Sequence, residues 1–234
     1  MRKHRFFISE EPKNYTPGNQ IEIDDQALVH QWNNVFRMEE GREVIVLDNS
    51  RFEYEAAILK LEKNKAVIEI LSKKKSEIEQ KIKILLCQAV IKKDNFEWIV
   101  QKCTELGVEE FVPLIAERSE KKNLNIERLR VIGKEAAEQS GRAFITKIHE
   151  PVTLEDALAG TKNDSIVFDA SGSPLHNSSA IIHNSCSVFI GPEGGWSERE
   201  LELFKQRGVK IFSLGNATLR AETAAISASA LMLL

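Results

Sequence analysis

A pair of glycine-bearing loops near the C-terminus constrains this 234-residue chain more than any other feature of its sequence. Each loop stands between a short apolar run and a predicted helix: the runs are 187–190 and 210–214, and the loops that follow them are 191–197 and 215–220. Short apolar runs bounded by turn residues are typical of buried strands. Because ligands bind at loops that leave the carboxyl ends of parallel strands, the two loops together predict a binding site.

A helix is predicted after each loop. Ser197, followed three residues later by Glu200, forms a capping box, which predicts that the first helix begins at Ser197. The second helix follows Arg220 and carries the apolar tail 224–234. That tail is shorter than the ~20 residues that a membrane span needs, so a buried helix and no membrane contact are expected.

Strands and helices alternate between residue 83 and the loops. The expected strands are short apolar runs at 84–90, 111–115, 145–149 and 165–168. The expected helices are one capped by Asp94 and ended by Gly107, one at 126–139 and one at 153–158. Such alternation predicts an α/β fold in which helices cover both faces of a parallel sheet.

The first 71 residues carry a different pattern. Short apolar runs predict strands at 5–8, 20–23, 43–48, 51–59 and 65–71. A helix from Asp25 to about Glu40 is expected among them because apolar residues recur there at helical spacing. Several short strands with one helix predict a small β-barrel module. The charged stretch 72–83, with its run of three lysines, is predicted to be a solvated linker rather than an RNA contact, which gives the domains 1–72 and 73–234.

Charge and cysteine content exclude several classes of protein. The formal net charge is -3, so no global positive field attracts nucleic acid, and RNA binding requires a local basic patch. Cys87, Cys103 and Cys186 are widely spaced and form no Cys-x-x-Cys pair, which argues against a disulfide framework and a zinc site. A cytoplasmic protein without a metal site is expected, because the basic N-terminus also leads into no signal-peptide core.

Neither glycine loop matches a common nucleotide motif. The Gly-x-Gly-x-x-Gly fingerprint is absent, and no Gly-Lys-Ser/Thr follows the first loop. Taken alone, the first loop is more readily a tight turn, and 219–223 is more readily a charged helix start. Their conjunction favours a ligand site, and a phosphate-binding regulatory domain, which rests on the glycines alone, is a weaker alternative.

Six ordered segments identify a family. They are His4-Arg5-Phe6-Phe7, His30 with 35–37 and Gly41, 104–108 with Pro113, Glu117-Arg118-Ser119, 135–142, and the two loops with 221–224. Together they resemble the ribosomal RNA small subunit methyltransferase E family across the whole chain. The chain departs from the family pattern at 216–218 (Asn-Ala-Thr, where Pro-Arg-Ile is frequent), at Trp196 (usually Phe) and at Phe36 (usually Leu).

The resemblance implies a fold and an activity. It implies an N-terminal PUA-like β-barrel and a C-terminal SPOUT α/β domain, with a deep trefoil knot and the cofactor site in about 165–234. It also implies a homodimer in the cytoplasm that uses S-adenosylmethionine to methylate N3 of a uridine in the 16S rRNA of the small ribosomal subunit.

The same resemblance assigns candidate site residues. The cofactor would bind Ile190, Gly191, Pro192, Glu193, Gly194, Gly195, Leu214, Gly215, Leu219, Arg220 and Thr223. Arg220 is the candidate for stabilising the uracil oxyanion, because guanidinium offers planar paired donors, and Glu222 is a candidate proton acceptor. An ion pair between Glu222 and Arg220, with Glu222 favouring the helix dipole, is an equally good interpretation.

RNA would bind a local basic patch. Its members would be His4, Arg5, His30 and Arg37 on the small domain and Arg118 and Arg142 on the large one. His30 and Arg37 would share one helical stripe, whereas Arg118 and Arg142 have Glu117 and Glu138 as alternative partners. Two rival functions stay open: a SPOUT enzyme that methylates a ribose 2′-hydroxyl, and a non-catalytic RNA-binding or ribosome-assembly module.

Overall fold

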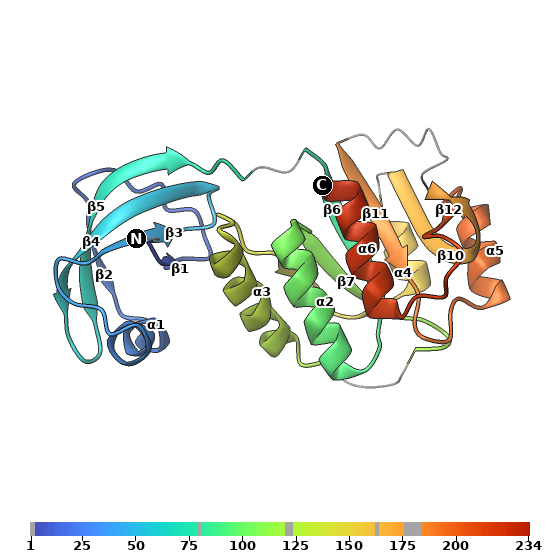
Figure 1. Cartoon of the computed structure of the whole chain (residues 1–234), viewed down its shortest axis with the longest axis horizontal. Coiled ribbons are helices and arrows are strands. Elements are labelled where there is room, and N and C mark those ends of the chain that lie inside the picture. Colours follow the sequence, from blue (N-terminus) through green and yellow to red (C-terminus); the bar gives the residue numbers. More distant parts are fainter. Residues whose placement is uncertain (1–2, 79–80, 120–123, 162–163, 176–183) are drawn as a thin grey trace. The chain divides into compact units, whose positions relative to one another are not determined.

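The computed structural model describes residues 3–78, 81–119, 124–161, 164–175 and 184–234. The chain divides into two compact units (Figure 1). The first comprises Met1–Glu79 with Ala137–Ile145, and the second comprises Gln80–Ala136 with Thr146–Leu234.

The first unit is built on a curled five-stranded sheet (Figure 1). Its strands, in spatial order, are β1 (Arg5–Phe7), β3 (Glu43–Leu47), β4 (Phe52–Leu61), β5 (Ala66–Lys75) and β2 (Gln20–Ile23). β1 pairs in parallel with β3, and the remaining pairs are antiparallel. Every strand expected in this region is present, within a few residues of its predicted bounds.

Alternating side chains bury both faces of this sheet around β1 and β3. Phe6, Val44 and Val46 enter a core with Trp32 and Tyr54 on one face. On the other face, a small cluster is completed by residues of the later segment, and its members are Phe7, Ile45, Leu47, Ala137 and Ala143. This second cluster explains why 137–145 belongs to the first unit.

The helix of the first unit is shorter than its sequence predicts. Asp25 caps α1 (Gln26–His30) by accepting bonds from the backbone N–H groups of the next turn, and a π-helical turn, η1 (Gln31–Val35), then ends it. The expected extension to Glu40 is wrong. Phe36 packs edge-on against Phe6, with ring centroids 5.3 Å apart, and Arg37 adopts a left-handed φ of 48°. A core contact therefore overrides the helical spacing of the apolar residues.

The lysine run is also different from its prediction. Lys73, Lys74 and Lys75 are not a linker but the end of β5, paired with β4. The Lys73 ammonium lies 4.3 Å from the centroid of the Phe52 ring. A lysine stem can lie along an apolar surface while its charge stays in water. The three lysines can therefore occupy strand positions, and β5 continues beyond the apolar residues that predicted it.

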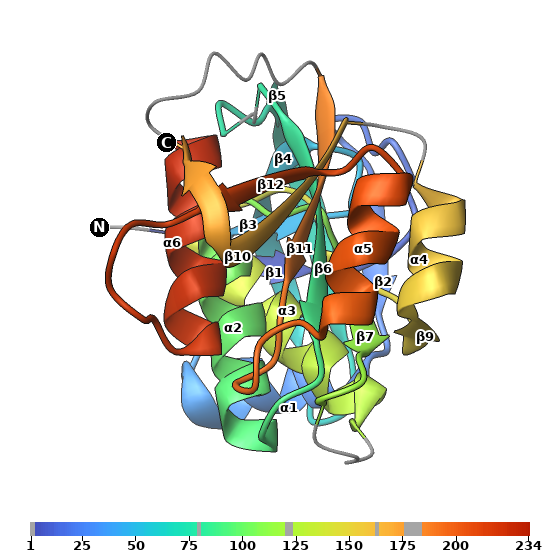
Figure 2. The same cartoon turned by 90° about the vertical axis from the view of Figure 1, so that its right-hand side faces the viewer.

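The second unit contains a parallel sheet, as expected (Figure 2). Its strands, in spatial order, are β12 (Lys210–Ser213), β10 (Asp164–Pro174), β11 (Ser185–Ile190), β6 (Lys83–Ala89), β7 (Glu110–Ile115) and β8 (Lys147–Ile148), and the short β9 (Val152–Thr153) also pairs with β7. All of these pairs are parallel.

Helices cover both faces of this sheet, which confirms the prediction (Figure 2). α2 (Lys93–Leu106), α3 (Ile126–Ser140) and α6 (Ala221–Leu233) pack on one face, and α4 (Leu154–Gly160) and α5 (Glu198–Gln206) pack on the other. The period-two alternation of strand side chains explains this arrangement, because Ile84 and Leu86 face the first layer and Cys87 and Ala89 the second.

Three local predictions for these helices have mixed outcomes. Gly107 ends α2 in the left-handed conformation at a φ of 118°, as expected, but the N-cap is Lys92, and Asp94 lies in the first turn. α6 is buried along one face, whereas Leu231 and Leu234 are exposed. Within the described ranges, no helix has both the length and the apolar character needed to cross a membrane.

Candidate active site

The two glycine loops leave the sheet at the same edge. Phe168 in β10 pairs with Ile190 in β11 on one side and with Phe212 in β12 on the other. Because all three strands are parallel, the loops after Ile190 and Ser213 emerge on either side of the β10 strand. The structure thus brings together the two loops that the sequence predicts to form one site.

The first loop is folded back by Trp196. The indole Nε1 donates a hydrogen bond of 3.2 Å to the carbonyl oxygen of Phe168, and the ring packs edge-on against Phe204 at 5.0 Å. A Cβ atom on Gly191 would lie 3.2 Å from the indole, so any side chain there would require the indole to shift by a few tenths of an ångström. Gly195 turns the loop with a φ of 65°.

A neighbouring loop holds the first glycine loop from outside. Arg118, which follows β7, donates from Nη1 to the carbonyl oxygens of Gly194 at 2.8 Å and Trp196 at 3.3 Å. Next to it, the backbone N–H of Glu117 donates to Oε1 of Glu200 at 2.9 Å. The ion pairs expected as alternatives for Arg118 are replaced by these bonds, and Glu117 instead pairs with Arg199.

The buried carboxylate of Glu200 has two functions. The predicted capping box is confirmed: Ser197 is the N-cap of α5, and its backbone N–H donates to Oε2 of Glu200 at 2.8 Å. Oε1 of the same side chain accepts the bond from Glu117. Glu200 therefore joins the start of α5 to the loop that carries Arg118.

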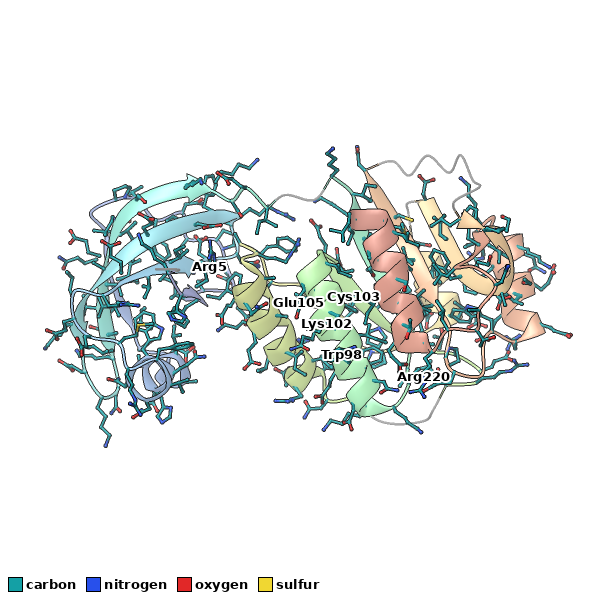
Figure 3. The ribbon with its side chains drawn as sticks, viewed as in Figure 1. Arg5, Trp98, Lys102, Cys103, Glu105 and Arg220 are labelled. Carbon is teal, nitrogen blue, oxygen red and sulfur yellow. The ribbon has the colours of Figure 1, made fainter. Side chains whose placement is uncertain are left out.

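The second loop is more exposed. Gly215 has a φ of 117°, 216–218 are exposed, and Leu214 and Leu219 are half-buried. Arg220 is the N-cap of α6, and its exposed side chain lies at the N-terminal end of that helix (Figure 3).

Glu222 lies in the first turn of α6 and is half-buried. Its Oε2 atom is buried and has no hydrogen-bond partner among the residues that the structure describes. Across the described part of the chain, Arg220 and Glu222 form no ion pair, so the predicted pairing is not observed. A buried acceptor without a donor is costly, and a ligand amine, hydroxyl or imide N–H would satisfy it.

The candidate RNA residues are distributed differently from the prediction. Arg5 forms an ion pair with Glu53 at 3.2 Å, and its guanidinium lies 3.7 Å from the position that a Cβ on Gly141 would take. Arg142 belongs to the first unit rather than the second and is 1% exposed, with its guanidinium 4.6 Å from the centroid of the Phe144 ring. This side chain is buried, so the expected surface patch does not contain it in this structure.

The remaining candidates are exposed. His30 and Arg37 do not share a helical stripe, because the helix ends between them. His4 lies beside Phe36, with ring centroids 4.5 Å apart, which places it near the Phe36–Arg37 turn.

Three residues of the site have roles that the sequence did not reveal. Trp196 bonds Phe168 within β10, Arg118 bonds the glycine loop, and Glu200 bonds a second loop in addition to its own N-cap. The sequence identified Glu200 through its capping box and Arg118 through the motif that contains it. It could not identify their hydrogen-bond partners, Glu117 and Gly194, because these residues lie far away in the sequence.

Comparison with known proteins places these features in a family. Residues 78–233 match a family model described as RNA methyltransferase domain. The Ribosomal RNA small subunit methyltransferase E of Rickettsia conorii is 30% identical in an alignment 237 residues long, which covers 98% of this chain and 95% of the relative. The protein of the same description from Bacillus subtilis is 30% identical over 221 residues, covering 86% and 84%.

Solved structures agree over nearly the whole chain. A Ribosomal RNA small subunit methyltransferase E from Neisseria gonorrhoeae bound to S-adenosyl methionine superposes with a TM-score of 0.92 at 28% identity, covering 99% of this chain and 97% of that one. A putative methyltransferase from Legionella pneumophila in complex with the cofactor SAM has a TM-score of 0.91 at 30% identity, with the same coverage.

Proposed function

The chain belongs to the ribosomal RNA small subunit methyltransferase E family, and we propose on this basis that it transfers a methyl group from S-adenosylmethionine to N3 of a uridine in 16S rRNA. The observation that carries the proposal is that two glycine loops leave the sheet on either side of Phe168, and that the helix after the second loop carries Glu222, whose buried Oε2 has no hydrogen-bond partner among the described residues. The whole-chain similarity to two structures that contain this cofactor supports it.

The proposal includes the finer architecture. The domain expected at 1–72, whose last strand continues to Lys75, is a PUA-like barrel, and the rest of the chain to 234 is a SPOUT domain with a trefoil knot in about 165–234. The curled sheet of the first unit supports the barrel, and the strand order with β10 between β11 and β12 is compatible with a knot. The protein acts as a cytoplasmic homodimer on the small ribosomal subunit. Light scattering combined with size-exclusion chromatography tests the dimer, and a monomer at micromolar concentration contradicts it.

The residues of both loops fit the cofactor. Backbone groups of Gly191, Gly194, Gly195 and Gly215 accept its adenine and ribose, with Ile190, Pro192, Glu193, Leu214 and Thr223 around them, and Leu219 forms an apolar wall. Glycine permits this close approach because a side chain would occupy the space that the ligand needs. Oε2 of Glu222, which accepts no hydrogen bond from the described residues, stays available for the N–H of a bound base.

Isothermal titration with S-adenosylmethionine tests this placement. Gly195 and Gly208 have similar left-handed φ values, 65° and 71°, and a Cβ on either would meet nothing within 4 Å. Gly195→Trp and Gly208→Trp therefore carry similar backbone strain. We expect cofactor affinity to be lost only in Gly195→Trp, and unchanged affinity in that variant would refute the placement.

The proposed chemistry requires N3 of the uracil to lose its proton as the methyl group arrives. When bound, S-adenosylmethionine supplies an electrophilic methyl group on a sulfonium. Arg220 donates hydrogen bonds to the uracil oxygen on which negative charge develops, and Oε2 of Glu222 accepts the N3 proton. The exposed position of Arg220 at the start of α6 leaves its guanidinium accessible to a base.

Single-turnover kinetics with saturating cofactor test these roles. We expect Arg220→Ala and Glu222→Gln to slow methyl transfer by about 100-fold, a typical loss for one transition-state donor or one acid–base group. Arg207→Ala, which removes an exposed arginine at the end of α5, is the control. A near-unchanged rate in Arg220→Ala rules out its catalytic role.

Product analysis identifies the methylated atom. Nucleoside mass spectrometry of 16S rRNA from cells with and without the protein should show N3-methyluridine that disappears with the gene. A 2′-O-methylated nucleoside would instead support the ribose methyltransferase, and no change in methylation would support a non-catalytic module.

Of the six candidate RNA residues, contacts are proposed for His4, His30 and Arg37, which are exposed on the first unit; Arg5 is paired with Glu53, Arg118 bonds the glycine loop, and Arg142 is buried. Binding of small-subunit RNA at several salt concentrations tests Arg37. Arg37→Ala should reduce the slope of log affinity against log salt by about 0.7, the value for one phosphate contact to a single strand, whereas Lys63→Ala, an exposed control in the same unit, should not. An unchanged slope in Arg37→Ala contradicts the contact.

A further inference from the structure

We infer that Arg118 is a positioning residue that holds the first glycine loop in its ligand-binding shape, and that its main effect is on cofactor binding rather than on RNA. The inference rests on the proposed function, because it concerns the loop that would bind S-adenosylmethionine. It gives Arg118 a role different from the RNA contact that its motif suggests.

Hydrogen bonds are the first evidence. One nitrogen, Nη1 of Arg118, donates to the carbonyl oxygens of Gly194 and Trp196, at 2.8 Å and 3.3 Å. These carbonyls flank Gly195, where the loop turns with a φ of 65°. A charged donor that bridges both sides of the turn favours this conformation over the many others that a glycine pair can adopt.

Packing is the second evidence. A Cβ atom on Gly194 would lie 3.3 Å from Cβ and 3.4 Å from Cδ of Arg118. The stem of the arginine thus lies directly against the glycine backbone and occupies the place of a side chain. The absence of a side chain at Gly194 and the presence of a long one at Arg118 are complementary.

The base of Arg118 is itself fixed. The turn 116–119 is closed by a hydrogen bond from the Ser119 N–H to the Ala116 carbonyl at 3.1 Å. The Glu117 N–H donates to buried Glu200, which caps α5. Because the arginine projects from a turn attached to the same helix that follows the glycine loop, it can restrain that loop rather than move with it.

Arg199 provides a matched control. It is an arginine close to the same loop, its side chain is 74% exposed, and it pairs with Glu117 and Glu155 at 2.9 Å and 3.0 Å. It makes no hydrogen bond to the glycine loop within the described residues. Removing it therefore changes local charge as much as removing Arg118 does, without releasing the loop.

The first experiment compares Arg118→Ala, Arg118→Lys and Arg199→Ala. Affinity for S-adenosylmethionine is measured by calorimetry, and affinity for small-subunit RNA by filter binding at two salt concentrations. We expect a loss of cofactor affinity of about tenfold or more in both Arg118 variants, because both hydrogen bonds to carbonyls come from Nη1, which lies further from the backbone than the ammonium of a lysine can reach. RNA affinity should change less than twofold, and Arg199→Ala should match the wild type in both assays.

The Arg118→Lys variant keeps the positive charge but loses the guanidinium group, so it separates the effect of charge from the effect of hydrogen-bond geometry. Full cofactor affinity in Arg118→Lys, or a lower RNA salt slope with unchanged cofactor affinity in Arg118→Ala, would overturn the inference and favour an RNA contact. With saturating cofactor, kcat should be largely retained, whereas KM for the cofactor rises. If the wild-type protein binds no S-adenosylmethionine, the proposed function itself fails, which is a different result from equal binding by wild type and variants.

A double-mutant cycle tests the contact directly. Gly194→Ala places a methyl group against the Arg118 stem and should weaken cofactor binding several-fold in the wild type. In an Arg118→Gly background, which removes the Cβ at 3.3 Å as well as the Cδ at 3.4 Å, the methyl group has room, so the same change should cost much less. Additive effects would show that the two residues act independently and would overturn the inference.

Discussion

Replacing the buried carboxylate of Glu200 by a carboxamide should weaken the framework of the site. Glu200 is 4% exposed, and its two oxygens accept bonds from the backbone N–H groups of Ser197 at 2.8 Å and Glu117 at 2.9 Å. Both partners are donors, so the side chain must offer two acceptors. Glutamine has nearly the same shape but offers one oxygen and one NH2 group.

The magnitude follows from these two bonds. In Glu200→Gln one N–H keeps a neutral acceptor, and the other faces an NH2 group and stays unsatisfied, at a cost of about 1–3 kcal/mol. The surviving bond also loses its charge, which brings the expected total to about 3 kcal/mol. For a protein of this size, each kcal/mol lowers Tm by about 2–4 °C, so a decrease of about 6–12 °C is expected.

Scanning calorimetry of the variant checks this estimate, with Glu198→Gln as the control. Glu198 is exposed in the first turn of the same helix, so its replacement removes a comparable dipole interaction, worth about 0.3–1 kcal/mol, without orphaning a backbone group. Equal Tm values for the two variants would refute the reasoning, because they would show that the two backbone N–H groups do not depend on the carboxylate.

Three further predictions concern other parts of the chain. Burial raises the pKa of Asp48, but its hydrogen bonds outweigh burial and hold the pKa below its ordinary 3.8. The stabilisation by Asp48 is therefore present above pH 3.8 and is lost as the pH falls through the lowered pKa. Acid unfolding should accordingly be steeper in the wild type than in Asp48→Asn. Trp196→Phe removes the bond to the Phe168 carbonyl while retaining an aromatic ring, so denaturant unfolding should show a loss of about 1 kcal/mol, and an unchanged midpoint would contradict that bond. Burial raises the pKa of Cys103 and of Cys186 to about 12, so a thiol reagent at about pH 8 should label neither in the native protein and both after unfolding; rapid native labelling would contradict the burial.

Local sequence signals predicted the framework well. The period of the apolar residues distinguished strands from helices, and glycine at 107 and the Ser197–Glu200 capping box marked helix ends that the structure confirms. These signals succeed because the interacting groups lie within one turn of each other. The parallel sheet follows from the βα alternation in the same way.

Predictions failed where a distant contact decided the local conformation. The helix after Asp25 stops at Val35 because Phe36 packs on Phe6, and β5 continues to Lys75 because β4 provides a partner strand. The burial of Arg142 is a further example, since 137–145 packs with the first unit. No short window of sequence contains both sides of such contacts.

The sequence by itself determined which segments could form the site: two strand–glycine–helix units whose order and residues also indicate the family. The tertiary structure decided how that site is held. It placed both loops beside Phe168, left Oε2 of Glu222 without a donor from the described residues, and brought Arg118 across 76 positions to the carbonyl of Gly194. The physical reason is that strand and helix signals act over a few residues, whereas burial and hydrogen-bond satisfaction depend on groups that meet only after the chain has folded.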